Sequence, residues 1–247
     1  MSRKRQPEFG LRTFAVTTRM PSLLPPHSAE WAQLIYATKS SLTVECPIGE
    51  RLWYVPARRA LWVPAGVASS LRMRGAVRLR MLYLHESLCT APQETHALNI
   101  APLLHEAIIE AVRRSVLPPD APLTRLILEL IAASSSAPLM LPMPRDPRAL
   151  RVATHLMRDP AKHETLEHHA QRAGAGVRTL ERIFATETGM GFAAWRQRLR
   201  VLESMRRLLN GDSVAAAADA VGYESVSAFV VAFKATMGET PGKWVRP

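Results

Sequence analysis

The sequence of 247 residues is poor in cysteine and in aromatic side chains, with two cysteines, Cys46 and Cys89, and 6% Phe, Trp and Tyr. Two cysteines are too few for a disulfide framework or a cysteine-based metal cluster. No apolar run approaches the roughly 18 residues that a membrane-spanning helix needs. The basic segment Met1–Pro7 has no apolar stretch behind it of the kind that secretory signals carry. We therefore expect a cytoplasmic protein whose basic tail is solvated, with an extra phosphate contact as the alternative.

Acidic side chains are also scarce, with 21 against 32 basic ones, which gives a formal charge of +11 and a pI near 10.6. Such an excess favours polyanionic partners through counterion release. The basic residues are spread along the chain: residues 1–144 hold 16 basic and 10 acidic side chains, and residues 145–247 hold 16 and 11. The charge agrees with nucleic-acid binding without locating it.

The first ninety residues alternate between apolar and polar side chains, which is typical of strands, and prolines and glycines separate the segments. Regular short strands of this kind predict a small barrel or sandwich. Helical spacing follows in Ile100–Arg114 and Leu123–Ala133, so we expect two appended helices. The predicted strands are Leu11–Thr18, Trp31–Thr38, Ser41–Cys46, Glu50–Val55, Ala60–Val63, Ser69–Arg74 and Val77–His85.

The segment Ser134–Pro147 reads SSSAPLMLPMPRDP and carries four prolines, so it cannot hold a helix. Asp146 followed by Pro147 is a good N-cap and first-turn pair, and it opens a second domain. The chain is thus predicted to divide into a first domain (residues 1–133), a linker (134–145) and a helical domain (146–247).

The helical domain repeats one pattern, in which an alanine stands four residues before a glycine and a phenylalanine stands five residues before another glycine. The offset between copies is 48 residues early and 49 late. A short helix, a glycine-containing turn and a second amphipathic helix is how a protein presents a helix end to the major groove of DNA. The two copies run through Leu166, Ala170, Gly174, Leu180, Phe184 and Gly189, and through Val214, Ala218, Gly222, Phe229, Phe233 and Gly238.

Caps and breakers predict the helices of this domain. The helix between the two copies, Phe192–Leu209, spans roughly 27 Å at 1.5 Å per residue. This length is close to one turn of B-DNA, roughly 34 Å, so the helix can hold two reading units in phase with the duplex. The remaining predicted helices are Pro147–Met157, Leu166–Ala173, Val177–Thr188, Val214–Val221, Val226–Met237 and a last turn after Pro241.

The first reading helix carries Arg178, Thr179 and Arg182 on the side away from its apolar face. An arginine at a helix start can bond guanine O6 and N7, which discriminates by about 1–3 kcal/mol. The alternative is that both arginines are solvated or pair with Glu181 and Glu187. In a duplicated motif we favour base contact for Arg182 and leave Arg178 evenly balanced.

The second reading helix presents side chains that can contact phosphates and thymine methyl groups but offer little bidentate readout. Its outward positions are Ser225, Val226, Ser227 and Val230 or Val231, with Lys234 further along. We therefore expect the first unit to supply most base specificity and the second mainly position and affinity. On the connecting helix, phosphate contact and an ordinary solvated face are equally good interpretations of each arginine. These arginines are Arg196, Arg198, Arg200, Arg206 and Arg207.

The stretch Ala218–Arg246 resembles the second helix–turn–helix motif of AraC/XylS-type bacterial transcription regulators, and Leu180–Gly189 resembles the first. The resemblance covers about 100 residues and implies seven helices, two of which enter adjacent major-groove segments. Many family members carry a basic residue where Val231 stands. The residues that match are Ala218, Gly222, Tyr223, Ser225, Phe229, Phe233, Gly238, Pro241 and Trp244.

Two stretches, Pro26–Leu34 and Arg59–Val67, resemble the cupin-like effector domain of one branch of that family. A metal-dependent cupin enzyme would need four ligands, but only His27 stands at a ligand position. Ala29 and Gln33 occupy the next two positions, and Ser69 falls near the fourth. One ligand of four cannot hold a catalytic metal, so we expect no metal, no cofactor and no catalysis. The residues interpreted as lining an effector pocket are His27, Trp31, Gln33, Trp53 and Trp62, with core packing as the alternative for the tryptophans.

These observations predict an α+β two-domain regulator with a cupin-like β-barrel, two appended helices and an all-α domain with two helix–turn–helix motifs. It would bind double-stranded DNA in the bacterial cytoplasm under control of a small-molecule effector, with homodimerisation through the first domain and RNA polymerase as a partner if it activates. The alternatives are a constitutive DNA binder whose barrel only dimerises and a metal-dependent cupin enzyme.

Overall fold

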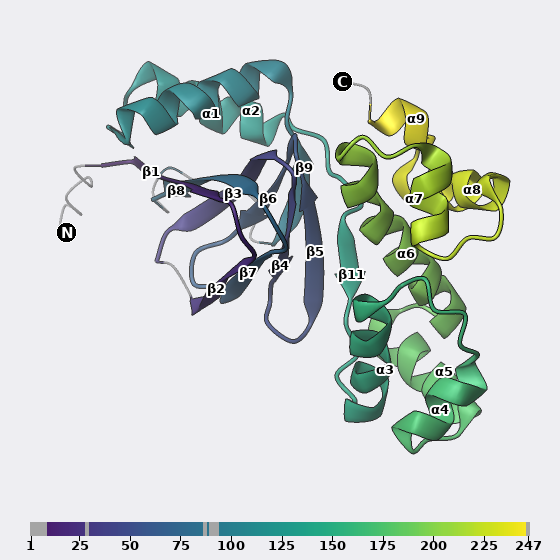
Figure 1. Ribbon diagram of the computed structural model, residues 1–247. Coiled ribbons are helices and arrows are strands. Elements are labelled where there is room, and N and C mark those ends of the chain that lie inside the picture. Colours follow the sequence, from purple (N-terminus) through teal and green to yellow (C-terminus); the bar gives the residue numbers. More distant parts are fainter. Residues whose placement is uncertain (1–8, 28–29, 86–87, 89–93, 246–247) are drawn as a thin grey trace. The chain divides into compact units, whose positions relative to one another are not determined.

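The computed structural model describes residues 9–27, 30–85, 88 and 94–245, and the chain divides into two compact units (Figure 1). The first unit comprises residues 1–48 and 55–137, and the second comprises residues 49–54 and 138–247. The basic tail that was considered for a phosphate contact lies outside the described residues. Within the described ranges, no helix has both the length and the apolar character that crossing a membrane requires.

The first unit is built on antiparallel sheets. In the described part of the chain, the hydrogen-bonded ladders form separate sheets, so the predicted α+β architecture is confirmed but the barrel is not closed. A second sheet contains β4 (Ser41–Glu45), β7 (Ser69–Met73) and β2 (Ser22–His27). The main sheet has the spatial order β10 (Val116–Leu117), β1 (Leu11–Thr18), β8 (Val77–Leu84), β3 (Ala32–Lys39), β6 (Arg59–Val63) and β9 (His96–Asn99).

Helices α1 (Pro102–Arg114) and α2 (Pro122–Ala132) cover one face of the main sheet (Figure 1). Leu34 pairs with Trp62, and both side chains belong to the cluster that packs against the helices. Gln33 pairs with Val63 and Tyr83 on neighbouring strands. Because successive strand residues point to opposite faces, Gln33 faces away from the helices. The register thus separates an apolar layer under the helices from a second face that contains a buried amide.

The second unit includes a short strand pair, β5 (Arg51–Pro56, of which Arg51–Tyr54 lie in this unit) and β11 (Met140–Pro142). Part of the predicted linker is therefore a paired strand. The pair is fixed to the long helix α6 (Phe192–Leu209) by several hydrogen bonds. These are Trp195 Nε1 to the Pro142 carbonyl at 2.7 Å, Arg198 Nε to the Met140 carbonyl at 2.7 Å, and Tyr54 Oη to Glu203 Oε1 at 3.0 Å.

The rest of the second unit is helical, and four of its described helices begin at the predicted caps Asp146, Thr165, Ser213 and Ser225. The Asp146 carboxylate accepts a hydrogen bond from the Arg148 amide at 2.9 Å, and Pro147 occupies the first turn of its helix. Predicted and observed bounds agree within one residue. Besides α6, the helices are α3 (Pro147–Arg158), α4 (Leu166–Ala173), α5 (Val177–Thr188), α7 (Val214–Ala220), α8 (Val226–Met237) and α9 (Pro241–Trp244).

Candidate nucleic-acid interface

Helices α4 and α5 form the first helix–turn–helix motif. The Thr165 hydroxyl caps α4 by accepting from the His168 amide, and Gly174 ends the helix in the left-handed conformation with φ of 64°. Leu180 and Phe184 of α5 are fully buried, and Phe184 packs edge-on against the ring of Phe192. Because this apolar side of α5 faces the core, its opposite side is presented to solvent.

Arg178 and Arg182 lie exposed on that outer side of α5. Their acidic neighbours have other partners: Glu187 Oε2 accepts from the backbone amides of Arg145 and Asp146 at 2.7 and 2.9 Å, and Glu181 Oε2 accepts from the Phe192 amide at 3.4 Å. Among the residues that the structure describes, neither arginine has an ion pair or a side-chain hydrogen bond. The alternative in which these arginines pair with Glu181 and Glu187 is therefore disfavoured. Thr179, next to Arg178 in the sequence, is half-buried.

Helices α7 and α8 form the second motif with the same capping chemistry. The Ser213 and Ser225 hydroxyls accept from the amides of Ala216 and Ala228, each at 3.1 Å. A chain of edge-to-face rings holds α8 to its surroundings, running from Tyr223 through Phe229 and Phe233 to Trp244. The outer side of α8 exposes Val226, Ser227, Val231 and Lys234. Helix α8 thus carries one charged side chain, Lys234, whereas α5 exposes two arginines and two glutamates.

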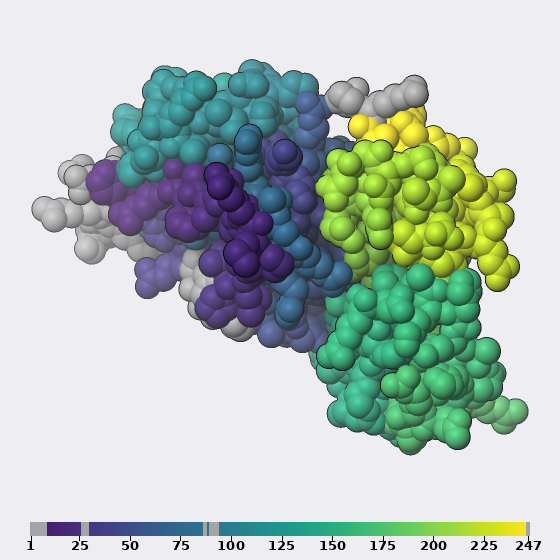
Figure 2. All heavy atoms as spheres, in the orientation of Figure 1, coloured from purple at the N-terminus to yellow at the C-terminus, as the bar shows by residue number. Residues whose placement is uncertain are grey.

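Figure 1 shows the first motif near one end of α6 and the second near the other, and in Figure 2 the two motifs form separate lobes of the helical unit. Arg200 of α6 connects them. Its guanidinium donates to the carbonyls of Pro160 and Lys162, before the first motif, and of Gly222, in the turn of the second. Gly222 has φ of +81°, and a Cβ there would lie 2.7 Å from the Ala161 carbonyl oxygen. The turn can therefore approach this loop only because residue 222 is glycine.

In the structure Arg198 and Arg200 have backbone partners, which favours a structural role over the phosphate contact. The Arg198 guanidinium donates to the Met140 and Pro138 carbonyls, and all three bonds of Arg200 go to backbone oxygens. Burial lowers the pKa of both groups. Arg196 donates to the Glu164 carbonyl at 3.1 Å and lies over the Phe192 ring. A face that sequence alone presents as solvated or phosphate-binding is in large part an internal brace.

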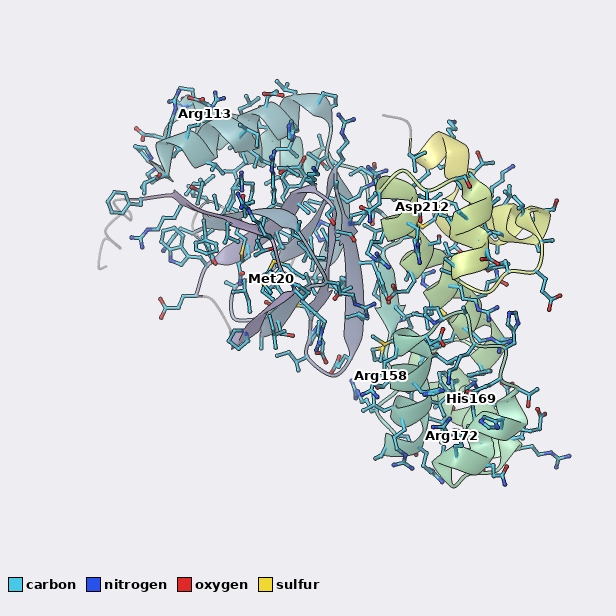
Figure 3. The ribbon with its side chains drawn as sticks, viewed as in Figure 1. Met20, Arg113, Arg158, His169, Arg172 and Asp212 are labelled. Atoms are coloured by element: carbon cyan, nitrogen blue, oxygen red, sulfur yellow. The ribbon has the colours of Figure 1, made fainter. Side chains whose placement is uncertain are left out.

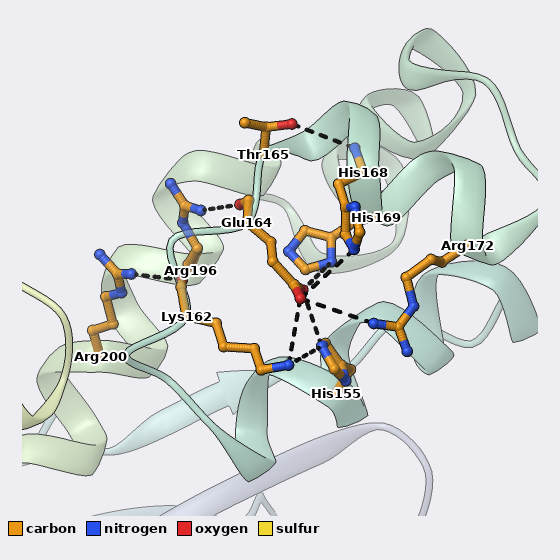
Figure 4. Close-up of polar contacts among 9 residues, drawn as sticks. All are labelled: His155, Lys162, Glu164, Thr165, His168, His169, Arg172, Arg196 and Arg200. Atoms are coloured by element: carbon orange, nitrogen blue, oxygen red, sulfur yellow. Dashed lines mark hydrogen bonds and ion pairs between the residues drawn. The ribbon is translucent and has the colours of Figure 1, made fainter.

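Glu164 lies at the centre of a polar network that the sequence analysis missed (Figure 4). His155 Nε2 lies 3.0 Å from the carboxylate, and Lys162, His168 and His169 lie within 3.4–3.6 Å. Burial acts to raise the pKa of Glu164, but hydrogen bonds from His155 and Lys162 outweigh it, so this pKa lies below its ordinary value. The network ties α3, the loop after it and α4 together.

His169 is 2% exposed, and burial lowers the pKa of its imidazole. Figure 3 shows His169 and Arg172 in the lobe of the first motif. The four-residue spacing from Glu164 to His168 was the available sequence signal for this network. Within the described ranges, no group of three or more His, Cys, Asp or Glu side chains is arranged to hold a metal ion.

The predicted effector-pocket residues are not all brought together. Trp62 packs under α1 and α2, on the opposite face from Gln33, and Trp53 belongs to the second unit, so neither shares the buried face of Gln33. Core packing is therefore the better interpretation of Trp62. Trp31 contacts the His85 ring and the Arg12 guanidinium. The side chain of His27 lies outside the described part of the chain.

Gln33, a predicted pocket residue, and Ser69, which stands near an absent metal-ligand position, are both buried polar side chains. Gln33 and Ser69 are each 0% exposed, and among the described residues Gln33 Nε2, Gln33 Oε1 and Ser69 Oγ have no hydrogen-bond partner. Ser69 shares a buried face of β7 with Leu71 and Met73, while Arg72 between them is exposed. An unpaired buried amide or hydroxyl costs about 1–3 kcal/mol. These atoms are therefore candidates for binding a polar group.

Known proteins match either the C-terminal part of the chain or most of its length. Residues 169–247 match the family described as "Helix-turn-helix domain". The chain is 30% identical over 225 residues to the HTH-type transcriptional regulator NimR of Escherichia coli. The aligned region covers 90% of this chain and 82% of NimR. It is 37% identical over 100 residues to a putative AraC-like transcription regulator of Streptomyces antibioticus, covering 40% of this chain and 33% of that protein.

Among solved structures, ToxT from Vibrio cholerae with bound unsaturated fatty acid aligns over 99% of this chain and 97% of its own, at 11% identity and a TM-score of 0.41. The family assignment rests on the sequence relatives, of which NimR is matched along most of its length. With its capped tandem motifs, the chain belongs to the AraC/XylS-type family of bacterial transcription regulators.

Proposed function

We propose that this DNA-binding regulator reads two adjacent major-groove segments, with base recognition concentrated in α5 through Arg178, Thr179 and Arg182. The observation that carries the proposal is the exposure of both guanidinium groups while the nearby carboxylates accept from backbone amides. A free guanidinium at a helix start can donate to both O6 and N7 of guanine. We therefore expect guanine in the half of the operator that α5 covers.

Helix α8 enters the neighbouring segment through Ser225, Val226, Ser227 and Lys234. The two motifs are held by α6, whose 18 residues span roughly 27 Å, close to the roughly 34 Å of one DNA turn. Arg200 ties both motifs to this helix, which supports a fixed separation between the two reading helices. Arg196 keeps a part-exposed position near the first motif, where it can add a phosphate contact.

The experiment that tests this proposal compares Arg182→Ala with Arg125→Ala, a variant that removes the same charge from an exposed site on α2. An operator is selected from random duplexes with the wild-type chain. Binding to it and to a scrambled duplex is then measured at one fixed salt concentration. We expect Arg182→Ala to lose about 10–100-fold of the preference for the operator, and Arg125→Ala to keep it. Equal preference in both variants would refute base recognition by α5.

We also propose that the first domain binds a small-molecule effector through its buried polar atoms. Gln33 and Ser69 offer an amide donor, an amide acceptor and a hydroxyl, all fully buried and without partners among the described residues. A ligand with a neutral hydrogen-bonding group would satisfy them. The ligand must bind one arrangement of the protein better than another to control DNA binding.

Effector binding is tested by calorimetry and thermal shifts against metabolites and drugs, followed by DNA footprinting with and without each compound that binds. A ligand that raises Tm and changes the footprint supports control. A footprint unchanged by every compound favours the constitutive alternative.

The same proposal includes the domain limits 1–133, 134–145 and 146–247. It also includes dimerisation through α1, where Leu103 is exposed, and contact with RNA polymerase at activated promoters. Sedimentation of the full chain tests the dimer. The family consists of regulators rather than enzymes, so the cupin-enzyme alternative is dropped.

A further inference from the structure

The two reading helices have equal lengths and equivalent ends, which allows a residue-by-residue comparison. Helices α5 and α8 each contain 12 residues, and each ends at a left-handed glycine, Gly189 and Gly238, 49 residues apart. With this offset, Ser227 stands where Arg178 stands, and Val231 stands where Arg182 stands. The place of the exposed guanidinium on the first helix is taken by an isopropyl group on the second.

Val231 is 71% exposed and Val226 is 43% exposed. The buried side of α8 is provided by Phe229, Ala232 and Phe233, so the fold does not need an apolar side chain at position 231. At 100° per residue, Ser227 and Lys234 lie between the two valines on the outer arc of the helix. Two exposed valines, with a serine and one lysine between them, therefore occupy the side that corresponds to the reading side of α5.

We propose that α8 reads thymine, with Val231 packing against the 5-methyl group of a thymine in the major groove and Val226 extending this apolar contact. The inference rests on the proposed function, in which α8 enters the groove. The thymine methyl is the apolar feature that base pairs present there, whereas cytosine N4 and adenine N6 are donors. A donor facing Val231 would lose its water without gaining a partner, so the valine both favours thymine and disfavours other bases.

The exposed charges near α8 include two lysines, together with Glu224 directly before the N-cap. Lys234 lies one turn beyond Val231 on the exposed side, and Lys243 of α9 is also exposed. Cationic side chains beside an apolar arc fit a surface in which phosphates flank the methyl groups. The operator is therefore bipartite, with guanine under α5 and thymine under α8.

The test uses the full chain and its selected operator, in which each thymine of the half under α8 is replaced in turn by deoxyuridine, which lacks only the 5-methyl group. Affinity is measured by fluorescence anisotropy at constant salt. We expect at least one replacement to weaken wild-type binding about fourfold, the effect of one methyl-sized group leaving an apolar contact. Replacements in the half under α5 should change affinity less than twofold.

Val231→Ala supplies the second arm. Its affinity for the normal operator should fall several-fold, and the sensitive deoxyuridine position should no longer matter, because the contact is already absent. Val116→Ala, at an exposed valine on β10, is the matched control and should retain the wild-type pattern. Thermal melting shows that each variant is folded.

The outcomes separate the two proposals. The inference is wrong if the selected operator has no thymine under α8, or if deoxyuridine has no effect while Arg182→Ala still loses discrimination. It is also wrong if Val231→Ala reduces transcription with unchanged DNA affinity, because the arc would then contact a protein such as RNA polymerase. If neither Arg182→Ala nor Val231→Ala alters DNA binding, the proposed function itself fails.

Discussion

Replacing Arg200 with alanine removes three hydrogen bonds to backbone carbonyls, at 2.9 Å to Pro160, 2.9 Å to Gly222 and 3.1 Å to Lys162. A hydrogen bond from a charged donor contributes about 1.5–3 kcal/mol when buried, and water will partly replace these bonds because the side chain is only partly buried. We therefore expect a loss of about 2–4 kcal/mol in the free energy of unfolding. For a helical unit of this size, that corresponds to roughly 10–20 °C in Tm.

The assay combines thermal melting with the salt dependence of DNA affinity. Because the guanidinium is committed to carbonyls, the slope of log affinity against log salt should equal that of wild type. Arg207→Ala is the control, because it removes a surface ion pair to Asp212 at 3.2 Å (Figure 3). Such pairs contribute about 0–1 kcal/mol, so its Tm should change little. Arg200→Lys should fall between, since one ammonium cannot reach three diverging carbonyls. An unchanged Tm with a slope reduced by about one would refute this reasoning and restore the phosphate contact.

Three further changes test other parts of the fold. Gly222→Ala should destabilise the helical unit by about 2–4 kcal/mol in denaturant unfolding, against about 1 kcal/mol for Gly174→Ala, because both glycines have positive φ but only Gly222 is crowded by Ala161. Glu164 has a pKa below its ordinary 4.5, so its stabilising contribution is present above that pH and is lost as pH falls through the folded-state pKa. The Tm of Glu164→Gln should therefore decrease less than that of wild type between about pH 5 and pH 3. Gln33→Leu should increase the free energy of unfolding by about 1–2 kcal/mol, and so raise Tm, because it removes an unpaired buried amide. The same variant should show no ligand-induced shift in Tm. Equal effects of both glycine variants, an unchanged pH profile, or a lower Tm for Gln33→Leu would contradict the respective assignments.

The sequence predicted those elements whose ends are fixed by local chemistry. Helices α4 and α8 begin and end at the predicted residues because Thr165 and Ser225 cap their first turns and glycines follow their last. Strand β2 was missed because Pro25 and Pro26 argue against a strand, although prolines are tolerated at an edge such as this one, which is hydrogen-bonded to β7. Strands of two to four residues, such as β9, β10 and β11, carry too little periodicity to be recognised.

Side-chain partners were much less predictable than elements. Arg182 and Arg200 are both arginines on amphipathic helices, and nothing local distinguishes them. Their difference comes from residues far away in the chain: Arg200 meets a loop 40 residues earlier and a turn 22 residues later, whereas the outer side of α5 faces solvent. Gln33 differs from the arginines, because the cupin-like resemblance already made it a predicted pocket residue. Its burial without a hydrogen-bond partner adds a physical reason for that prediction.

The duplication also explains where the two motifs are free to differ. Gly174 and Gly222 end the first helices of the two copies, yet only Gly222 touches another segment, the loop that precedes the first motif. The second motif is therefore seated on the first through its turn and through Arg200, and neither position can vary without moving the other motif. Outward positions carry no such packing constraint, so arginine and valine can occupy equivalent places at 182 and 231. If both helices enter DNA as proposed, a pair held this way selects the spacing of its two half-sites as strictly as their bases.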